Sequence, residues 1–198
     1  RLTSELSREA IVDIEVPPPD WVPKAQQVSF KEFLYKLAGG GTGGKDGPIP
    51  PDYAVEKLNT RATRLKWILN ETMGAAGDFE FRRAELAALS RLTPEDVGDD
   101  EVVESYLESL APGGFMRQYL EQGQLAYVHG ETLYVHGGIM GKFPSAAGGS
   151  CLGVVPGQAH NIGDVVAWAA ALNAWKEREV AQWVEEPEWR CSLAARDP

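Results

Sequence analysis

The sequence predicts a mostly helical chain with one β-hairpin. Three observations carry this prediction: apolar residues recur at helical spacing through most of 28–122, two β-rich runs stand at 125–129 and 132–136, and a long amphipathic stretch follows residue 163. The chain has 198 residues, of which 43% are hydrophobic, so it can bury one ordinary core. A single domain is therefore expected.

Three segments are expected along the chain. Residues 1–27 combine a helix, indicated by apolar spacing over 1–12, with a proline-rich stretch that excludes helix. Residues 28–122 are predicted to be helical. Residues 123–198 are predicted to hold the hairpin, a glycine-rich loop and a long C-terminal helix.

The helical segment opens with a capping box. Ser29 precedes Glu32 by three positions, the spacing at which each side chain satisfies the other residue's backbone N–H, so a short helix is expected through Leu37. Residues 38–51 are rich in Gly and Pro and are predicted to form a loop.

One long amphipathic helix is predicted from Asp52 to about Gly74, because glycine commonly ends a helix. Its apolar positions are Val55, Leu58, Ala62, Leu65, Ile68 and Leu69. Another helix is predicted over 79–92, with apolar positions at Phe79, Leu86 and Leu89.

Two more helices are expected before the hairpin. Thr93 and Pro94 carry the signature of a helix start, followed by acidic charge at the positive end of the helix dipole, so a helix is predicted over about 101–110. A further helix is predicted over 115–122, with Gly123 as its stop.

The hairpin prediction depends on the pair Gly130-Glu131, since a glycine in the first position suits a two-residue type II′ turn. After a loop over 141–163, Asn161 or Asp164 is expected to cap the long helix. This helix carries tryptophans at intervals of seven and eight residues, which places them along one face: Trp168, Trp175 and Trp183. Such a face is expected to pack in a core or to contact other protein chains.

Composition excludes several classes of partner. The formal net charge of −10 argues against nucleic acid and anionic membranes, which bind basic patches. No apolar stretch approaches the roughly 20 residues that span a bilayer. Cys151 and Cys191 are too few for a disulfide framework and are interpreted as reduced thiols, which favours a soluble protein of a reducing compartment. The organelle is not indicated. The absence of a starting methionine predicts a processed product or a piece of a longer protein.

A glycine-rich stretch at 39–46 is close to the phosphate-binding loop of nucleotide-binding proteins. The spacing of Gly39, Gly44 and Lys45 fits, but Asp46 stands where a Ser or Thr hydroxyl should bind magnesium. A helix precedes the loop where a strand is required, and Pro48 follows closely. The stretch is therefore interpreted as an ordinary loop.

The sequence contains three histidines, and each is a candidate for the functional site. His136 ends the second β-rich run and precedes Gly137-Gly138, a pair that permits close backbone approach to a ligand. His129 ends the first run beside the turn and is not expected to face His136. His160 lies shortly before the long helix, whose N-terminus favours an anion such as phosphate.

The run Tyr134-Val135-His136-Gly137-Gly138 resembles the Val-His-Gly-Gly element of calcineurin-like metallophosphoesterases. The resemblance implies that His136 binds one of two divalent metals (Mn, Fe or Zn), with His129 and His160 as second-shell or phosphate-facing residues. It also implies an αββα sandwich of the α/β class, in which residues 28–122 form a helical insertion.

The family builds its metal site from five elements, and this chain contains one of them. It lacks the Gly-Asp-x-His, Gly-Asp-x-x-Asp, Gly-Asn-[His or Arg]-[Glu or Asp] and Gly-His-x-His elements. Residues 1–6 resemble the helix that follows the asparagine-bearing element. The resemblance therefore implies a single partial domain, 1–198, from the middle of a phosphoesterase. Such a chain is expected to be inactive alone, since one histidine does not hold a metal pair.

Two alternatives remain open at this point. A degenerate member of the family could serve as a non-catalytic structural or interaction subunit of a larger assembly, contacting other chains through its tryptophan face. A helical binding module with a coincidental hairpin motif is the third interpretation, favoured if His136 points into an apolar core.

Overall fold

The computed structural model describes residues 6, 13–18, 22–39, 52–136 and 153–186. They fall into two compact units. Unit 1 contains the described residues up to 111, and unit 2 contains those from 112 to 186. The described chain is mostly helical with one antiparallel hairpin, which confirms this part of the predicted fold class.

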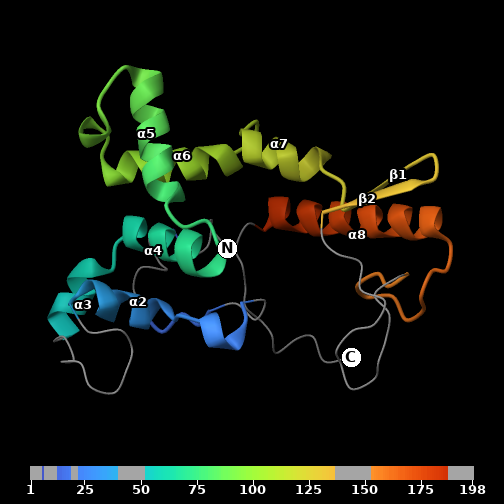
Figure 1. Cartoon of the computed structure of the whole chain (residues 1–198), viewed down its shortest axis with the longest axis horizontal. Helices are drawn as coiled ribbons and strands as arrows, with labels where there is room; N and C mark the ends of the chain where they lie inside the picture. The colour runs from blue at the N-terminus through green and yellow to red at the C-terminus, as the bar shows by residue number, and fades with distance from the viewer. Residues whose placement is uncertain (1–5, 7–12, 19–21, 40–51, 137–152, 187–198) are drawn as a thin grey trace. The chain divides into compact units, whose positions relative to one another are not determined.

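Unit 1 is built from helices (Figure 1). In chain order these are the 3₁₀ turn η2 (Lys24–Gln26), α2 (Phe30–Leu37), α3 (Asp52–Leu58), α4 (Arg61–Trp67), the π-helical turn η3 (Ile68–Thr72), α5 (Asp78–Ser90), the 3₁₀ turn η4 (Pro94–Asp96) and α6 (Asp99–Leu110).

The capping box at the start of α2 is confirmed. The Ser29 hydroxyl accepts a hydrogen bond from the Glu32 N–H at 3.2 Å, and the Glu32 carboxylate accepts one from the Ser29 N–H at 2.8 Å. The two bonds satisfy donors that the first turn of a helix leaves free.

The prediction of one continuous helix from Asp52 to Gly74 is wrong. The chain leaves the helix at Asn59, and Thr60 starts a new one by accepting a hydrogen bond from the Thr63 N–H at 3.1 Å. The apolar spacing was unaffected by the break, so periodicity alone did not reveal it. A hydroxyl that caps a helix competes with helix continuation at its own position.

The second half of that segment ends in a π turn. The Met73 N–H donates to the Ile68 carbonyl five residues back, at 3.0 Å. Gly74 then adopts a positive φ of 67°, and the Ala75 N–H donates to the Leu69 carbonyl at 2.9 Å. Gly74 thus ends the helix as expected, in the left-handed conformation that glycine tolerates.

Helix α5 agrees with prediction within two residues at each end, but Leu89 was misplaced. Phe79 is buried and Leu86 half-buried, whereas Leu89 is 73% exposed and Phe81, which the same helix carries, is 70% exposed. Thr93 does form a capping box, with Asp96, but it caps the short turn η4. Helix α6 starts separately at Asp99.

Two apolar clusters hold unit 1 together, and α4 with η3 contributes to both. The first cluster contains Leu6, Ala62, Leu65, Leu69, Phe79, Ala87, Val97, Val102 and Val103. The second contains Val16, Phe30, Phe33, Leu34, Val55, Trp67 and Ile68. Helix α4 and its π extension therefore form the wall between two cores.

Unit 2 consists of α7 (Phe115–Gln122), β1 (Ala126–His129), β2 (Thr132–Val135) and α8 (Val165–Glu185). The bounds of α7 and the position of the hairpin turn are as predicted. Gly130 has a φ of 57° and Glu131 does not have a positive φ, the pattern of a type II′ turn. Of the two proposed caps for α8, Asp164 is the one used, accepting from the Ala167 N–H at 2.8 Å.

Several predictions fall outside the described residues. These concern the helix over 1–12 apart from Leu6, the glycine-rich stretch 40–46, Gly137-Gly138, and both cysteines. Among the residues that are described, no helix combines the length and hydropathy needed to cross a membrane.

Candidate functional site: the exposed face of the hairpin

The hairpin has one face packed and one face open. The register pairs Ala126 with Val135 and Val128 with Leu133, and these four side chains are buried or half-buried. The hairpin lies along α8 (Figure 1), and β1 makes the contact with that helix. Because side chains alternate along a strand, the remaining positions share the opposite face.

Two of the three candidate histidines, His129 and His136, lie on or beside that open face. The exposed positions are Leu125, Tyr127, His129, Thr132, Tyr134 and His136. The Tyr127 and Tyr134 rings are paired across the strands with centroids 6.4 Å apart, and the His129 ring stacks on Tyr127 at 6.4 Å. The face is thus an aromatic platform with a histidine toward each end.

His129 and His136 do not face each other, as the spacing predicted. His129 is opposite Thr132 in the register, next to the turn. His136 lies four residues after Thr132 in the direction of β2. At about 3.4 Å of rise per residue the two imidazoles are on the order of 13 Å apart. That separation is too large for a shared metal ion.

His136 is exposed and follows β2 directly. It does not point into an apolar core, the placement that would favour the interpretation as a helical binding module with a coincidental motif. A side chain at the rim of a strand is free to bind a ligand supplied from outside the hairpin.

His160 lies in a loop that is fixed to α8. The Gly153 carbonyl accepts from the Ile162 N–H at 2.8 Å, and the Trp168 indole N–H donates to the Val154 carbonyl at 2.9 Å. A methyl group at Gly153 would stand 2.3 Å from the Ile162 carbonyl oxygen, so glycine is required there. His160 is exposed on this loop.

Asn173 attaches the hairpin to α8. Its carboxamide oxygen accepts from the Leu125 and Ala126 N–H groups at 2.9 and 3.3 Å, and its amide donates to the Ala126 carbonyl at 2.8 Å. One side chain therefore pairs with the backbone edge of β1 as a neighbouring strand would. Asn173 was not among the candidates from the sequence. The available signal was a lone asparagine between Leu172 and Ala174, since amides removed from water are generally hydrogen-bonded.

The described residues do not by themselves fit a metal pair. Within the described ranges, no group of three or more His, Cys, Asp or Glu side chains could hold a metal ion. Beside β1, a cavity of about 330 Å³ is lined mostly by apolar groups and Asn173: Gln124, Ala126, Tyr127, Val128, Val166, Ala169, Ala170 and Asn173. It presents neither a carboxylate nor an imidazole.

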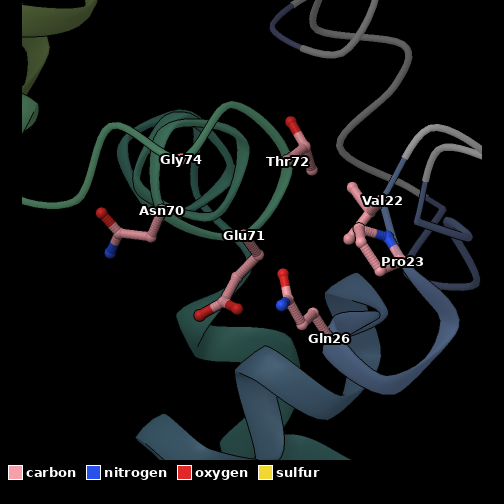
Figure 2. Close-up of a pocket in the computed structure, with 7 residues that line it drawn as sticks. All are labelled: Val22, Pro23, Gln26, Asn70, Glu71, Thr72 and Gly74. Carbon is pink, nitrogen blue, oxygen red and sulfur yellow. The ribbon is translucent and has the colours of Figure 1, made fainter. Parts of the chain in front are cut away.

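Unit 1 has a separate cavity of about 320 Å³ at the end of the π turn (Figure 2). Val22 and Pro23 form one wall, and the side chains of Gln26 and Glu71 point toward one another across the space. The Asn70 side chain is engaged elsewhere, with its oxygen 3.4 Å from the Gly77 N–H. One carboxylate in an open cavity is no catalytic arrangement.

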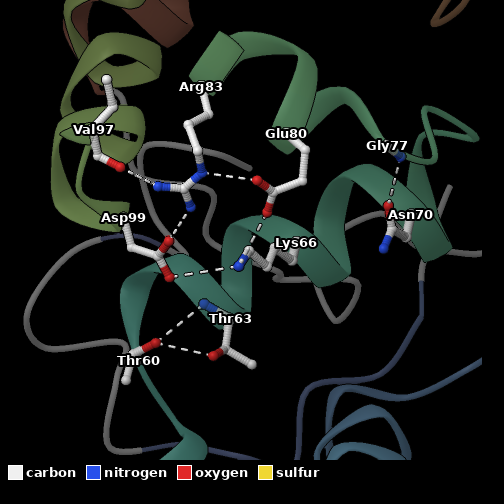
Figure 3. A network of polar contacts seen from close by, with 9 residues as sticks. All are labelled: Thr60, Thr63, Lys66, Asn70, Gly77, Glu80, Arg83, Val97 and Asp99. Atoms are coloured by element: carbon white, nitrogen blue, oxygen red, sulfur yellow. Dashed lines mark hydrogen bonds and ion pairs between the residues drawn. The ribbon is translucent and has the colours of Figure 1, made fainter. Parts of the chain in front are cut away.

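Four charged side chains of unit 1 form a closed ring of ion pairs (Figure 3). Glu80 contacts Arg83 at 2.8 Å and Lys66 at 3.5 Å, and Asp99 contacts Lys66 at 3.5 Å and also Arg83. Both cations lie over the Phe79 ring, at 4.3 Å for Lys66 and 5.3 Å for Arg83. The ring joins α4, α5 and the start of α6.

These contacts lower the pKa of both carboxyl groups, Glu80 and Asp99. The hydrogen bond from Arg83 lowers the pKa of Glu80. Burial alone would raise the pKa of Asp99, but the Arg83 hydrogen bond and the charges of Lys66 and Arg83 outweigh it and lower the pKa. The Glu80 bond raises the pKa of Arg83. Each charge has an opposite neighbour, so the ring stabilises the helices and offers no unpaired group to a ligand.

The hairpin face with His136 is therefore the best candidate site in the described chain, and comparison with known proteins adds no constraint to it. No family model, no curated protein and no solved structure matches this chain.

Proposed function

We propose that this chain is the central piece of a calcineurin-like metallophosphoesterase domain, and that the complete protein hydrolyses phosphate esters. In that domain the hairpin belongs to one sheet of an αββα sandwich, and residues 28–122 are a helical insertion. His136 supplies one ligand to a pair of divalent metals, Mn, Fe or Zn. His129 and His160 are second-shell or phosphate-facing residues.

The observation that carries the proposal is the placement of His136. It follows a β-strand directly, it is exposed, and Gly137-Gly138 succeed it in the sequence. A strand end is a rigid support for a ligand, and the two glycines allow backbone and substrate to approach closely. In this proposal the other metal ligands come from the four family elements that this sequence lacks.

The test is the phosphatase activity of the protein encoded by the gene extended on both sides of Arg1 and Pro198. We expect metal-dependent hydrolysis of an aryl phosphate by that protein with manganese, and none by residues 1–198 alone. His136→Ala should reduce kcat/KM by roughly 100-fold or more, since loss of a residue that only orients a metal ligand already costs about 10–100-fold.

Thr132→Ala is the matched control, because Thr132 is exposed on the same face at the opposite end of the hairpin and has no role in the proposed site. It should leave metal affinity nearly unchanged. Turnover by the isolated chain, or full activity in the extended protein after His136→Ala, would overturn the proposal.

A non-catalytic interaction subunit is the alternative function. The tryptophan face supports it only in part: Trp168 is buried within unit 2 and hydrogen-bonded there, while Trp175 and Trp183 are half-buried. In this alternative, Trp175 and Trp183 are therefore the residues that contact other chains. Degenerate metal elements in the flanking gene, with loss of assembly in a Trp175→Ala/Trp183→Ala variant, would favour this function over the first.

A further inference from the structure

The two backbone edges of the hairpin differ. In a hairpin with a two-residue turn, the pair that closes the turn exchanges ladder hydrogen bonds, and bonded and non-bonded pairs alternate from there. The outward N–H and C=O groups therefore belong to Ala126 and Val128 on β1 and to Leu133 and Val135 on β2. The bonds from Asn173 to both polar groups of Ala126 agree with this assignment.

The edge of β1 is covered, whereas the residues that the structure describes leave the edge of β2 open. Asn173 pairs with the outward groups of Ala126, and α8 lies against β1. The backbone N–H and C=O groups of Leu133 and Val135 that point outward have no hydrogen-bond partner among the described residues. An open edge of this kind is a template for a further strand.

β2 also lacks the features that protect an edge. Natural edge strands carry charges, proline or a bulge, which prevent pairing with another chain. The sequence of β2 is Thr-Leu-Tyr-Val, with neither charge nor proline and with a high preference for strand. Of its two exposed side chains, Thr132 and Tyr134, the tyrosine is 56% exposed.

We propose that a second copy of this chain pairs with β2 along this edge, antiparallel, with Tyr134 on the two-fold axis. The outward groups fix this register: Leu133 of each copy stands opposite Val135 of the other in a pair that exchanges two hydrogen bonds. The result is a four-stranded sheet whose interface is the same patch on both copies, as a two-fold dimer requires.

The occupant is a second copy because the register is self-complementary. It places apolar Leu133 against apolar Val135 on the α8 side of the sheet. On the open face it continues the Tyr127–Tyr134 pair into a ladder of four tyrosines, and aromatic cross-strand pairs stabilise sheets. A two-stranded hairpin is only marginally stable by itself, and a four-stranded sheet is more stable.

The helices permit this arrangement. α8 contacts β1, and the two β1 strands of the dimer lie three strand spacings apart, about 14 Å at roughly 4.8 Å each. Packed helices need about 8–10 Å between their axes, so both copies of α8 fit beneath one sheet. The inference uses the backbone and side chains of unit 2 alone and does not depend on the proposed phosphoesterase function.

The test is the molar mass of residues 1–198 in solution, measured by light scattering or sedimentation at physiological salt over a wide range of concentration. We expect a concentration-dependent shift from the monomer mass of 21.6 kDa to twice that value. Tyr134→Glu places like charges opposite each other on the axis and should raise the dissociation constant by at least about tenfold. Tyr127→Glu is the matched control, equally exposed on β1 but away from the axis, and should have the smaller effect.

A cross-link tests the register. With Cys151 and Cys191 replaced by serine, Tyr134→Cys should form an intermolecular disulfide on mild oxidation, because facing Cα atoms of a non-bonded pair are about 4.5 Å apart. Tyr127→Cys should not. A chain that stays monomeric at all concentrations, or a dimer that is affected equally by changes at Tyr134 and Tyr127, would overturn the inference.

Discussion

The two units differ in how they obtain their stability. Unit 1 buries large side chains in two clusters, among them Trp67, Phe30 and Leu65 with almost no exposure. In the described part of unit 2, the buried hydrophobic side chains are Ala126, Val155, Trp168 and Ala169. Hydrophobic stabilisation grows with the apolar area removed from water, so burial contributes more to the stability of unit 1 than to that of unit 2.

Unit 2 relies on a few specific polar contacts in place of a large core. Asn173 attaches the hairpin to α8, and the Trp168 indole fixes the preceding loop. Individual bonds of this kind contribute about 1 kcal/mol each. The comparison teaches that unit 1 has the larger apolar core, whereas the described sheet of unit 2 has two strands, which pairing with other strands would extend.

The largest expected effect is loss of the core of unit 1. Trp67 is fully buried, contacts Phe30 with centroids 5.4 Å apart and donates to the Val28 carbonyl at 2.9 Å. Trp67→Ala should lower the free energy of unfolding by about 3–5 kcal/mol. Denaturant unfolding followed by circular dichroism measures it. Trp175→Ala, at a half-buried position of α8, is the control, and an equal loss there would remove the contrast between the units.

The next effect concerns unit 2. Asn173→Ala leaves the N–H groups of Leu125 and Ala126 and the Ala126 carbonyl without their partner, at a cost of about 1–3 kcal/mol. Hydrogen exchange should accelerate at the hairpin amides while the amides of α4 and α6 keep their protection. Unchanged exchange in the hairpin would show that Asn173 does not hold it.

A smaller effect depends on pH and belongs to unit 1. The pKa values of Glu80 and Asp99 are lowered in the folded chain, so the stabilisation is present above their ordinary values of about 4 and is lost as pH falls through the lowered values. Both carboxylates are substantially exposed, which limits the effect to no more than about 1 kcal/mol.

The measurement is the unfolding midpoint of the wild type between pH 6 and roughly pH 2.5, a window that brackets the ordinary carboxyl pKa of about 4. An Arg83→Met variant should show a shallower decline. It removes the hydrogen bonds to Glu80 and Asp99, while Phe79 keeps an apolar neighbour. High salt should reduce the difference between the two proteins. Identical pH profiles would contradict the stabilising role of the ring.

The smallest predicted effect is a gain. Arg91 follows α5 with a φ of 56°, the left-handed conformation, and the Leu92 N–H donates to the Ala87 carbonyl at 2.8 Å. Arg91→Gly should stabilise unit 1 by about 0.5–1 kcal/mol, because glycine adopts this conformation without steric cost. Ser90→Gly, one residue earlier and inside the helix, should destabilise by a similar amount. Thermal unfolding distinguishes the two, and destabilisation by both would refute the explanation.

Interactions between neighbouring residues were readable from the sequence. The Ser29–Glu32 capping box, the Asp164 cap and the Gly130 turn were all predicted, since each depends on groups within three residues of one another. The exposed position of His136 at the end of β2 is consistent with its expected place at the rim of a strand. Its metal role remains a prediction.

What the sequence did not reveal depends on distant partners. Arg64 is fully buried, and it is held by the Asn59 side chain, the Asp13 carbonyl and the face of Phe30. No spacing rule places a guanidinium in a core, because the groups that offset its desolvation come from elsewhere in the chain. The exposure of Leu89 was missed for the same reason: periodicity marks an apolar face, but the neighbouring elements decide whether it is covered.

The sequence alone therefore determined the helical character of the chain, the cap of α2 and a hairpin with His136 at its end. The tertiary structure decided which face of that hairpin is open, which edge Asn173 covers, and how a ring of four charges joins α4, α5 and α6. The physical reason is range: caps and turns are satisfied within one turn of chain, whereas burial, edge pairing and ion pairing depend on residues brought together only by folding.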